Sequence, residues 1–366
     1  MSFRRWLITV LSFLAAIGAS VWIIRSSWSA DGARVSLPLW THAAALAAAA
    51  LETLFRAVKI HWGARALGIP LSVRTCIRVI LGGDFGAAIT PARSGAEPAR
   101  FLVMSEAGVP VAGSIIVLFT EIVLEMLSLA AVAVALGFLL DGSGAMAGGL
   151  AGLVGGYTAF IIGAGVGGYA LSKRNASGPP PRWARRVGLH AGRWRTVQRS
   201  LRQLRGSMDS LRRASWWMMF LSFCFSVLHV LARLAILPII MIGLGASIDL
   251  APLVLWPMAI LYGGAVAPAP GGGGLIEVAF RAALDGHIPV ALMGAALLWW
   301  RVYTFYVLLV AGGLVAGNLV LRALRKGDEE ADDPAAAAAA AVASDAADAA
   351  DARRDAEPLE ESTGRA

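Results

Sequence analysis

The chain has little of what soluble enzymes and disulfide-rich proteins are built from. Only 15% of its 366 residues are charged, and it has two cysteines and five histidines. Cys76 and Cys224 lie far apart and neither has a CxxC partner, so neither a disulfide framework nor a zinc site is indicated. The histidines form no HExxH motif, and no glycine-rich segment ends in Gly-Lys-Ser/Thr. We therefore expect no metal, no cofactor and no nucleotide, and no nucleic-acid partner.

What the chain has in excess is long apolar runs. Hydrophobic residues make up 57% of it, and six runs approach or exceed the roughly 20 residues that cross a bilayer. These runs are Ile8–Ile24, Pro38–Leu54, Val111–Leu140, Met146–Leu171, Trp216–Leu244 and Pro289–Leu321. We predict an all-α polytopic membrane protein. The first run is longer than the apolar core of a signal peptide, which favours an uncleaved anchor.

The basic residues predict the orientation of the chain. The segment 173–213 contains twelve Lys or Arg residues against one acid, Asp209. Cytoplasmic loops carry such an excess, and Arg4, Arg5 and the basic cluster Arg322–Lys326 follow the same rule. We therefore expect a multi-pass protein of the bacterial inner membrane with both termini in the cytoplasm.

Two apolar regions, Leu71–Pro110 and Ala251–His287, are interrupted by proline, glycine and charge. If each were one more full crossing, both termini and the basic loop could not lie on one side. Six full spans plus two oppositely oriented re-entrant hairpins satisfy that rule, the first opening to the cytoplasm and the second to the outside. An eight-span arrangement is the alternative.

The turns of the two hairpins resemble each other. Thr90–Glu97 and Ala267–Glu277 each contain proline, small residues and a glutamate three residues after a plausible helix cap, Ser94 or Gly274. This spacing predicts a capping box at each turn. Opposite entry sides and a shared pattern indicate an inverted repeat, which is typical of secondary transporters with a site near the bilayer midplane. Chance similarity of two Pro/Gly turns is the alternative.

The glycine run Gly271–Gly274 precedes a helix predicted to begin at Leu275. Irregular backbone at membrane depth is tolerated only where protein buries it or where it lines a wet cavity. A helix N-terminus behind exposed backbone N–H groups is an anion site. We predict such a site here, with a flexible turn that binds nothing as the alternative.

Charged residues four positions apart share a helix face. The pairs are Glu52/Arg56, His229/Arg233, Glu277/Arg281 and the like-charged Glu121/Glu125. Glu121 and Glu125 need a cation, a proton or water at membrane depth, and we predict them to bind a coupling ion or proton. Arg301 is the expected partner for them, or a phosphate contact.

The candidate substrate-binding residues come from the two turns and the arginines near them. They are Arg93, Ser94, Gly95, Glu97, Arg100, Gly271, Gly272, Gly273, Gly274, Glu277, Arg281 and Arg301.

The predicted domains are an integral membrane domain, 1–326, and a disordered Ala/Asp-rich cytoplasmic tail, 327–366. Within the basic loop 173–213, apolar residues from Trp194 to Leu211 alternate three and four apart, with arginines on most of the other face. That pattern predicts an amphipathic helix in the headgroup plane, with a coiled coil of fewer than three heptads as the alternative.

Several of these motifs resemble the flippase-like family, whose members are homologous to the transmembrane part of bacterial lysylphosphatidylglycerol synthase. The matching segments are Gly83-Asp84-Phe85, Thr90–Arg100, Glu121 and Pro270–Glu277, and the resemblance runs from about Arg5 to about Leu324. It implies handling of a phospholipid or related amphiphile, and Glu97, Arg100 and Glu277 match its motifs. One extra residue between Pro91 and Glu97 departs from the family spacing.

The resemblance does not imply aminoacylation, which in the synthase belongs to a separate soluble domain. We expect a protein that is not an enzyme and that moves a lipid, with an anionic headgroup, between leaflets. The alternatives are a membrane-embedded lipid-modifying enzyme with a metal at Glu121/Glu125, and a non-catalytic lipid-binding scaffold. The sequence leaves the identity of the lipid and the oligomeric state open.

Overall fold

The computed structural model describes residues 3–28, 36–140, 213–246, 249–264 and 269–318, together with isolated positions between 148 and 194. Every regular element in these ranges is helical, which confirms the predicted all-α class. Most of the expected fourth run Met146–Leu171, the basic loop with its amphipathic helix, and the Ala/Asp-rich tail lie outside the described residues.

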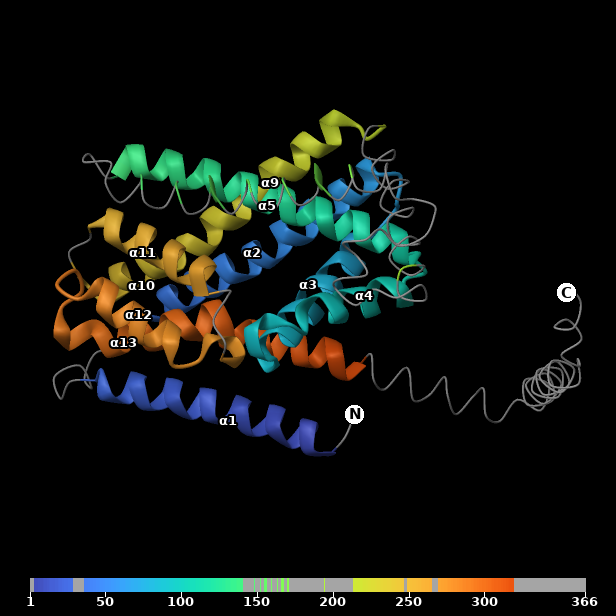
Figure 1. Cartoon of the computed structure of the whole chain (residues 1–366). Coiled ribbons are helices and arrows are strands. Elements are labelled where there is room, and N and C mark those ends of the chain that lie inside the picture. The colour runs from blue at the N-terminus through green and yellow to red at the C-terminus, as the bar shows by residue number, and fades with distance from the viewer. Residues whose placement is uncertain are drawn as a thin grey trace, which may run out of the picture. The chain divides into compact units, whose positions relative to one another are not determined.

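The elements follow one another along the chain as helices and short helical turns (Figure 1). They are α1 Phe3–Ser26, α2 Leu39–Ala66, α3 Val73–Ile89, η2 Pro91–Arg93, α4 Ala96–Glu106, α5 Val111–Leu140, α9 Trp216–Leu234, α10 Ile236–Gly243, α11 Leu250–Gly263, η4 Pro270–Gly272, α12 Leu275–Leu284, α13 Val290–Arg301 and η5 Val302–Tyr306.

Three of the described helices are long and apolar enough to cross a bilayer: 111–140, 216–243 and 290–318. The second of these bends between α9 and α10, where Pro238 cannot donate a backbone hydrogen bond to Leu234. The third contains a π-helical turn, η5. The helices make this a multi-pass membrane protein, whereas the six-span count stays a prediction.

Helix α2 is long enough to span but carries Glu52, Arg56 and Lys59, all of them buried. These residues lie four and then three positions apart, so they share one face of the helix. That face is covered because α2 packs along α9 and also contacts α3 and α5. The neighbouring helices therefore shield these charges from lipid.

The two interrupted regions form helical hairpins, α3–α4 and α11–α12. Their turns, η2 and η4, contact each other, and η4 also contacts α1 and α3. In Figure 1 the two hairpins approach from opposite ends of the helical bundle, so that their turns meet between them. This arrangement brings together residues nearly two hundred positions apart in the sequence.

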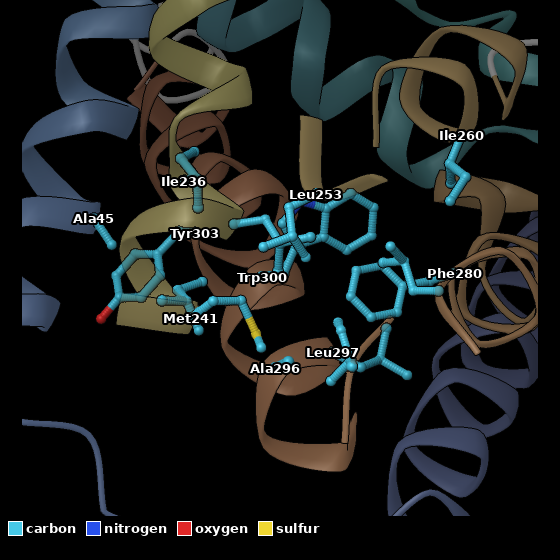
Figure 2. Close-up of a cluster of buried hydrophobic side chains, with 14 of the residues drawn as sticks. Ala45, Ile236, Met241, Leu253, Ile260, Phe280, Ala296, Leu297, Trp300 and Tyr303 are labelled. Carbon is cyan, nitrogen blue, oxygen red and sulfur yellow. The ribbon is translucent and has the colours of Figure 1, made fainter. Parts of the chain in front are cut away.

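An apolar core holds the second hairpin against α10 and α13. Phe280 of α12 and Trp300 of α13 are fully buried and their ring centroids are 4.7 Å apart. Figure 2 shows these rings with Leu253, Leu297 and Met241 packed around them. Aromatic pairs at this separation add to the stabilisation from burial, so the base of the hairpin is firmly positioned.

Candidate functional site

The two hairpin turns begin in the same way and then diverge, at Ser94 (ψ −20°) and Gly273 (ψ 134°). Each begins with an extended residue and proline, followed by two residues in the left-handed region: Ala92 and Arg93 (φ 50° and 56°), and Gly271 and Gly272 (φ 59° and 67°). In each turn the next residue donates its N–H to the proline carbonyl, over 3.1 Å. The similarity noticed in the sequence therefore corresponds to a shared geometry over the first residues of each turn.

The predicted capping box of Ser94 and Glu97 is wrong. Helix α4 begins one residue later, with Gly95 as its cap, and Ala99 donates the first helical hydrogen bond to the Gly95 carbonyl. A cap at Ser94 would need that first bond from Pro98, which has no N–H. The hydroxyl of Thr90 accepts from the Gly95 N–H at 2.8 Å instead.

The second capping interaction is confirmed. Helix α12 begins at Leu275, and Oε2 of Glu277 accepts from the Gly274 N–H at 2.7 Å. The carboxylate is completely buried. The Glu277 carboxylate therefore occupies part of the anion site that the sequence predicts at this helix N-terminus.

Glu277 also has a cationic partner, Arg301. Its Oε1 lies 2.7 Å from the Arg301 Nε and accepts a 2.5 Å hydrogen bond from Ser20 of α1. Arg301 donates to the Gly271 carbonyl at 3.3 Å, and its guanidinium lies over the Phe305 ring, 4.4 Å from the centroid. The turn of the second hairpin is therefore fixed to α1 and α13 through one buried ion pair.

Positive φ favours glycine at positions 271 and 272, and space restricts positions 271, 272 and 273. A Cβ on Gly271 would lie 2.4 Å from the Phe305 ring, and one on Gly273 would lie 2.6 Å from the Ala16 carbonyl. At Gly272 a Cβ would lie 2.5 Å from Ile276. Any side chain here would strain the turn, so substitutions of these glycines report on structure as much as on ligand binding.

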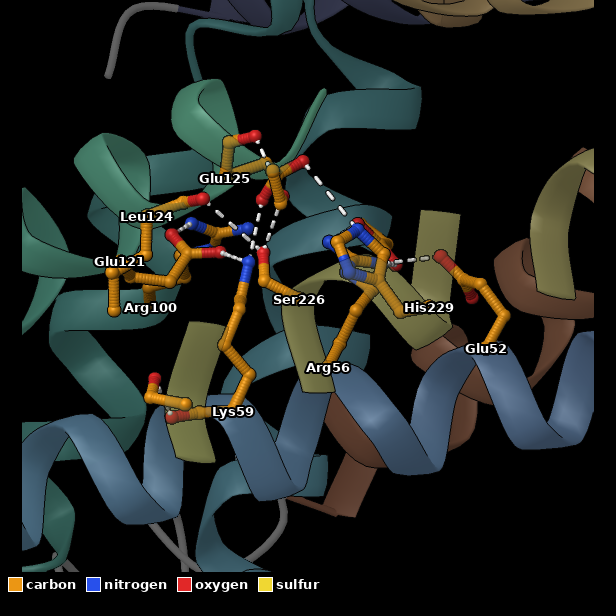
Figure 3. A network of polar contacts seen from close by, with 12 residues as sticks. Glu52, Arg56, Lys59, Arg100, Glu121, Leu124, Glu125, Ser226 and His229 are labelled. Carbon is orange, nitrogen blue, oxygen red and sulfur yellow. Dashed lines mark hydrogen bonds and ion pairs between the residues drawn. The ribbon is translucent and has the colours of Figure 1, made fainter. Parts of the chain in front are cut away.

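A second polar cluster lies between α2, α4, α5 and α9 (Figure 3). The ammonium of Lys59 is 2.8 Å from a carboxylate oxygen of Glu121 and 2.8 Å from one of Glu125. Arg100 of α4 approaches Glu121 at 3.0 Å and Glu97 at 3.3 Å. The cation that the like-charged pair requires is therefore Lys59, a residue that our sequence reasoning missed.

The same cluster continues toward the first hairpin. Arg56 donates two hydrogen bonds to Asp84 of α3, at 2.7 and 3.1 Å, and lies 3.5 Å from Glu52. Arg233 of α9 is 3.6 Å from the same Glu52 carboxylate. Paired charges of this kind are the arrangement in which ionised groups persist inside a membrane protein.

A narrow cavity lies between these two clusters and touches both hairpin turns. Its polar lining consists of Asp84, Arg93, Arg233, Arg301 and Thr304 together with the backbone of Gly271 and Gly272. The cavity volume is about 60 Å³, which is room for a few water molecules and too little for a phospholipid headgroup. The structure therefore represents a state in which the turns are closed on each other.

Arg93 differs from the other two arginines that line this cavity. Within the described ranges it forms neither a hydrogen bond nor an ion pair, whereas Arg233 and Arg301 each have a carboxylate partner. Its φ of 56° is costly for a residue with a side chain. Strain of this kind at a cavity indicates a functional position.

Two predicted partnerships are not formed. Arg301 pairs with Glu277 and not with Glu121 or Glu125. Arg281 is exposed on the other face of α12, where it lines a separate hollow with Trp22 and Asp285, so it is not the partner of Glu277. Ser94 is exposed as well.

Sequence reasoning missed Lys59, Arg56 in its role toward Asp84, and Asp84 itself as a cavity residue. Two signals could have found them. Glu52, Arg56 and Lys59 recur four and three positions apart in a predicted span, and Asp84 stands alone between apolar residues. Charges in such positions are functional candidates by default.

Comparison with known sequences assigns the chain to a family. Among curated proteins, none matches the chain. The model of the lysylphosphatidylglycerol synthase TM region matches residues 6–312, which include both hairpins and both polar clusters. The chain belongs to the family of the lysylphosphatidylglycerol synthase TM region.

Proposed function

We propose that this protein moves a lipid with an anionic headgroup between the leaflets of the bacterial inner membrane, without changing the lipid covalently. The family membership supports a role with membrane lipids. The observation that carries the proposal is the cavity at the hairpin turns, where Arg93 has no hydrogen-bond or ion-pair partner among the described residues and Arg233 and Arg301 also line the wall. When the turns separate and the cavity widens, a phosphate would find there a guanidinium able to bind it in a fork geometry.

The charges around the cavity favour an anion over a cation. The one carboxylate in its lining, Asp84, already accepts two hydrogen bonds from Arg56. Arg93, Arg233 and Arg301 come from three separate parts of the fold, so a phosphate could bridge them. Charge-assisted hydrogen bonds to phosphate are among the stronger polar contacts in proteins.

The closed turns support a two-sided mechanism. If the hairpins enter from opposite sides as the sequence predicts, separating their turns in one direction or the other would open the cavity to either leaflet. The anchoring ion pairs are then the fixed points: Glu277–Arg301 for the second hairpin and Arg56–Asp84 for the first. Glu121 and Glu125, held by Lys59 and Arg100, are proposed as the place where a proton or ion couples to this movement.

The test is a leaflet-resolved assay in proteoliposomes. The probes are headgroup-accessible fluorescent phosphatidylglycerol and phosphatidylcholine, each with the label on an acyl chain. We expect the protein to accelerate the crossing of the anionic probe more than that of the zwitterionic one. Equal rates with and without protein would contradict translocation, and a new lipid species in mass spectra of the same vesicles would point to the enzyme alternative.

A further inference from the structure

A second hollow lies beside the polar cavity, between α11 and α12. It is lined by ten residues that are apolar except for one indole: Trp256, Ala259, Ile260, Gly263, Gly264, Leu275, Ile276, Ala279, Ala282 and Ala283. Its volume is about 570 Å³, many times that of the polar cavity. We call it the hairpin groove.

The hairpin groove and the polar cavity are neighbours that share a wall, in which the buried Ile276 side chain lies between Gly264 and Gly272. Gly264 and Ile276 line both of them. On the far side of Ile276 the cavity presents Gly272 and Arg301, and on the near side the groove presents Ala279 and Ala283. One molecule placed across Ile276 would therefore meet apolar surface at one end and arginines at the other.

Small residues make the groove. Alanine occupies positions 259, 279, 282 and 283, and a Cβ added at Gly263 would meet nothing within 4 Å. Helices α11 and α12 stay apart along the groove because Glu277 and Arg301 fix η4 and the N-terminus of α12 in place. The indole nitrogen of Trp256 is buried without a hydrogen-bond partner in the described part of the chain. The hollow is thus maintained by the fold and is open to an apolar occupant.

We propose that the hairpin groove binds one hydrocarbon chain of the transported lipid while its headgroup phosphate reaches the polar cavity past Ile276. This inference rests on the proposed function for the identity of the occupant. Inside the bilayer the groove gives a hydrocarbon chain van der Waals packing, and it has no charged side chain in its lining that would disfavour the chain. The arginines beyond Ile276 select an amphiphile with an anionic head over a neutral hydrocarbon.

The groove and the polar cavity should determine different parts of the lipid specificity. Trp256 and Leu275 line the groove and not the polar cavity, whereas Arg93 and Arg301 line the cavity and not the groove. Changes in the groove should therefore alter the preference for chain length or branching and leave the preference for headgroup charge unchanged. Changes at Arg93 should do the opposite.

The test uses the full chain in phosphatidylcholine vesicles and a phosphatidylglycerol probe with a diazirine in one acyl chain. After irradiation, peptides are mapped by mass spectrometry. We expect label concentrated on 250–263 and 275–284, and about tenfold less label there in Ala279→Phe, in which a ring fills the groove. Gly263→Leu fills it from the other helix without a backbone clash, so it repeats the test should Ala279→Phe fold poorly.

The matched control is Ala135→Phe, which makes the same change on the exposed face of α5. It should leave the labelling of the groove unchanged. Excess unlabelled phosphatidylglycerol should compete with the probe and phosphatidylcholine should not. A diazirine fatty acid tests the other source of a chain: if it labels the groove as strongly as the phospholipid, free fatty acid is the occupant and the proposal is overturned.

Label spread evenly over all lipid-facing helices and unaffected by either variant would show ordinary boundary lipid and would overturn the inference as well. The labelling does not require transport. Specific labelling without transport would therefore contradict the proposed function alone, whereas transport with an unlabelled groove would contradict only the hydrocarbon site.

Discussion

The carboxylate of Glu277 lies 2.7 Å from the guanidinium of Arg301, and both side chains are at most 2% exposed. The same carboxylate caps α12 through the Gly274 N–H. Glu277 is therefore both a helix cap and the counter-ion of a buried arginine. These two roles make different predictions for one substitution.

Glu277→Gln should destabilise the protein strongly. Glutamine can still accept from the Gly274 N–H, so the cap alone would cost little. Removing the charge leaves Arg301 buried without a counter-ion, at a cost of about 3–5 kcal/mol. Thermal unfolding in detergent, followed by tryptophan fluorescence, measures the loss.

The double variant Glu277→Gln with Arg301→Met should recover most of that stability, because no unpaired charge remains. Glu106→Gln is the control, since Glu106 is partly exposed in its pair with Arg78. A Glu277→Gln protein as stable as the control would reduce Glu277 to a helix cap.

Lys59→Met should be among the most damaging changes in α2. It leaves Glu121 and Glu125 facing each other without their shared cation, a loss of about 3–5 kcal/mol for the broken buried pair. Arg65→Met, at the exposed end of the same helix, should change stability by less than about 1 kcal/mol. The comparison uses unfolding temperatures of purified proteins at one detergent concentration.

Adding Glu125→Gln to Lys59→Met should restore part of the lost stability. In an Arg65→Met background the same change should lower stability, because Lys59 is still present and loses a carboxylate partner. Independent losses in all combinations would mean that Lys59 and Glu125 are not coupled.

Arg93→Gly should separate folding from function. Glycine adopts the left-handed φ of this position without penalty, and its extra freedom in the unfolded chain offsets that gain, so stability should stay within about 1 kcal/mol of the natural protein. Because the unpaired guanidinium is lost, the rate for the anionic probe should fall toward that for the zwitterionic one.

Ala92→Gly is the matched control, because Ala92 shares the left-handed conformation but has no charge. Its transport rate should equal that of the natural protein. Unchanged anionic selectivity in Arg93→Gly would remove this arginine from the binding site.

Cysteine labelling tests the opposed hairpins. In a chain with Cys76 and Cys224 replaced by alanine, a cysteine at Ala107, after the first hairpin, should resist an impermeant thiol reagent in intact cells. A cysteine at His287, after the second hairpin, should react. Both positions are exposed, so a difference between them reports the side of the membrane. Reaction of both, or of neither, would contradict the two-sided arrangement.

The sequence by itself determined the membrane class, the all-helical fold, the two hairpins and the likeness of their turns. Apolar run length and proline–glycine interruptions are local properties, and a local pattern suffices for them. The start of α4 was also within reach, because Pro98 excludes a cap at Ser94 by its missing N–H.

Only the tertiary structure decided which charges meet. Glu121 and Glu125 were expected to pair with Arg301. Lys59 of α2 lies between them instead, and Arg301 pairs with Glu277. The order of residues along a chain says which face of a helix a charge occupies, but its partner depends on how the helices pack. The cavity at the hairpin turns and the groove beside it exist for the same reason, since their walls come from helices that are distant in sequence.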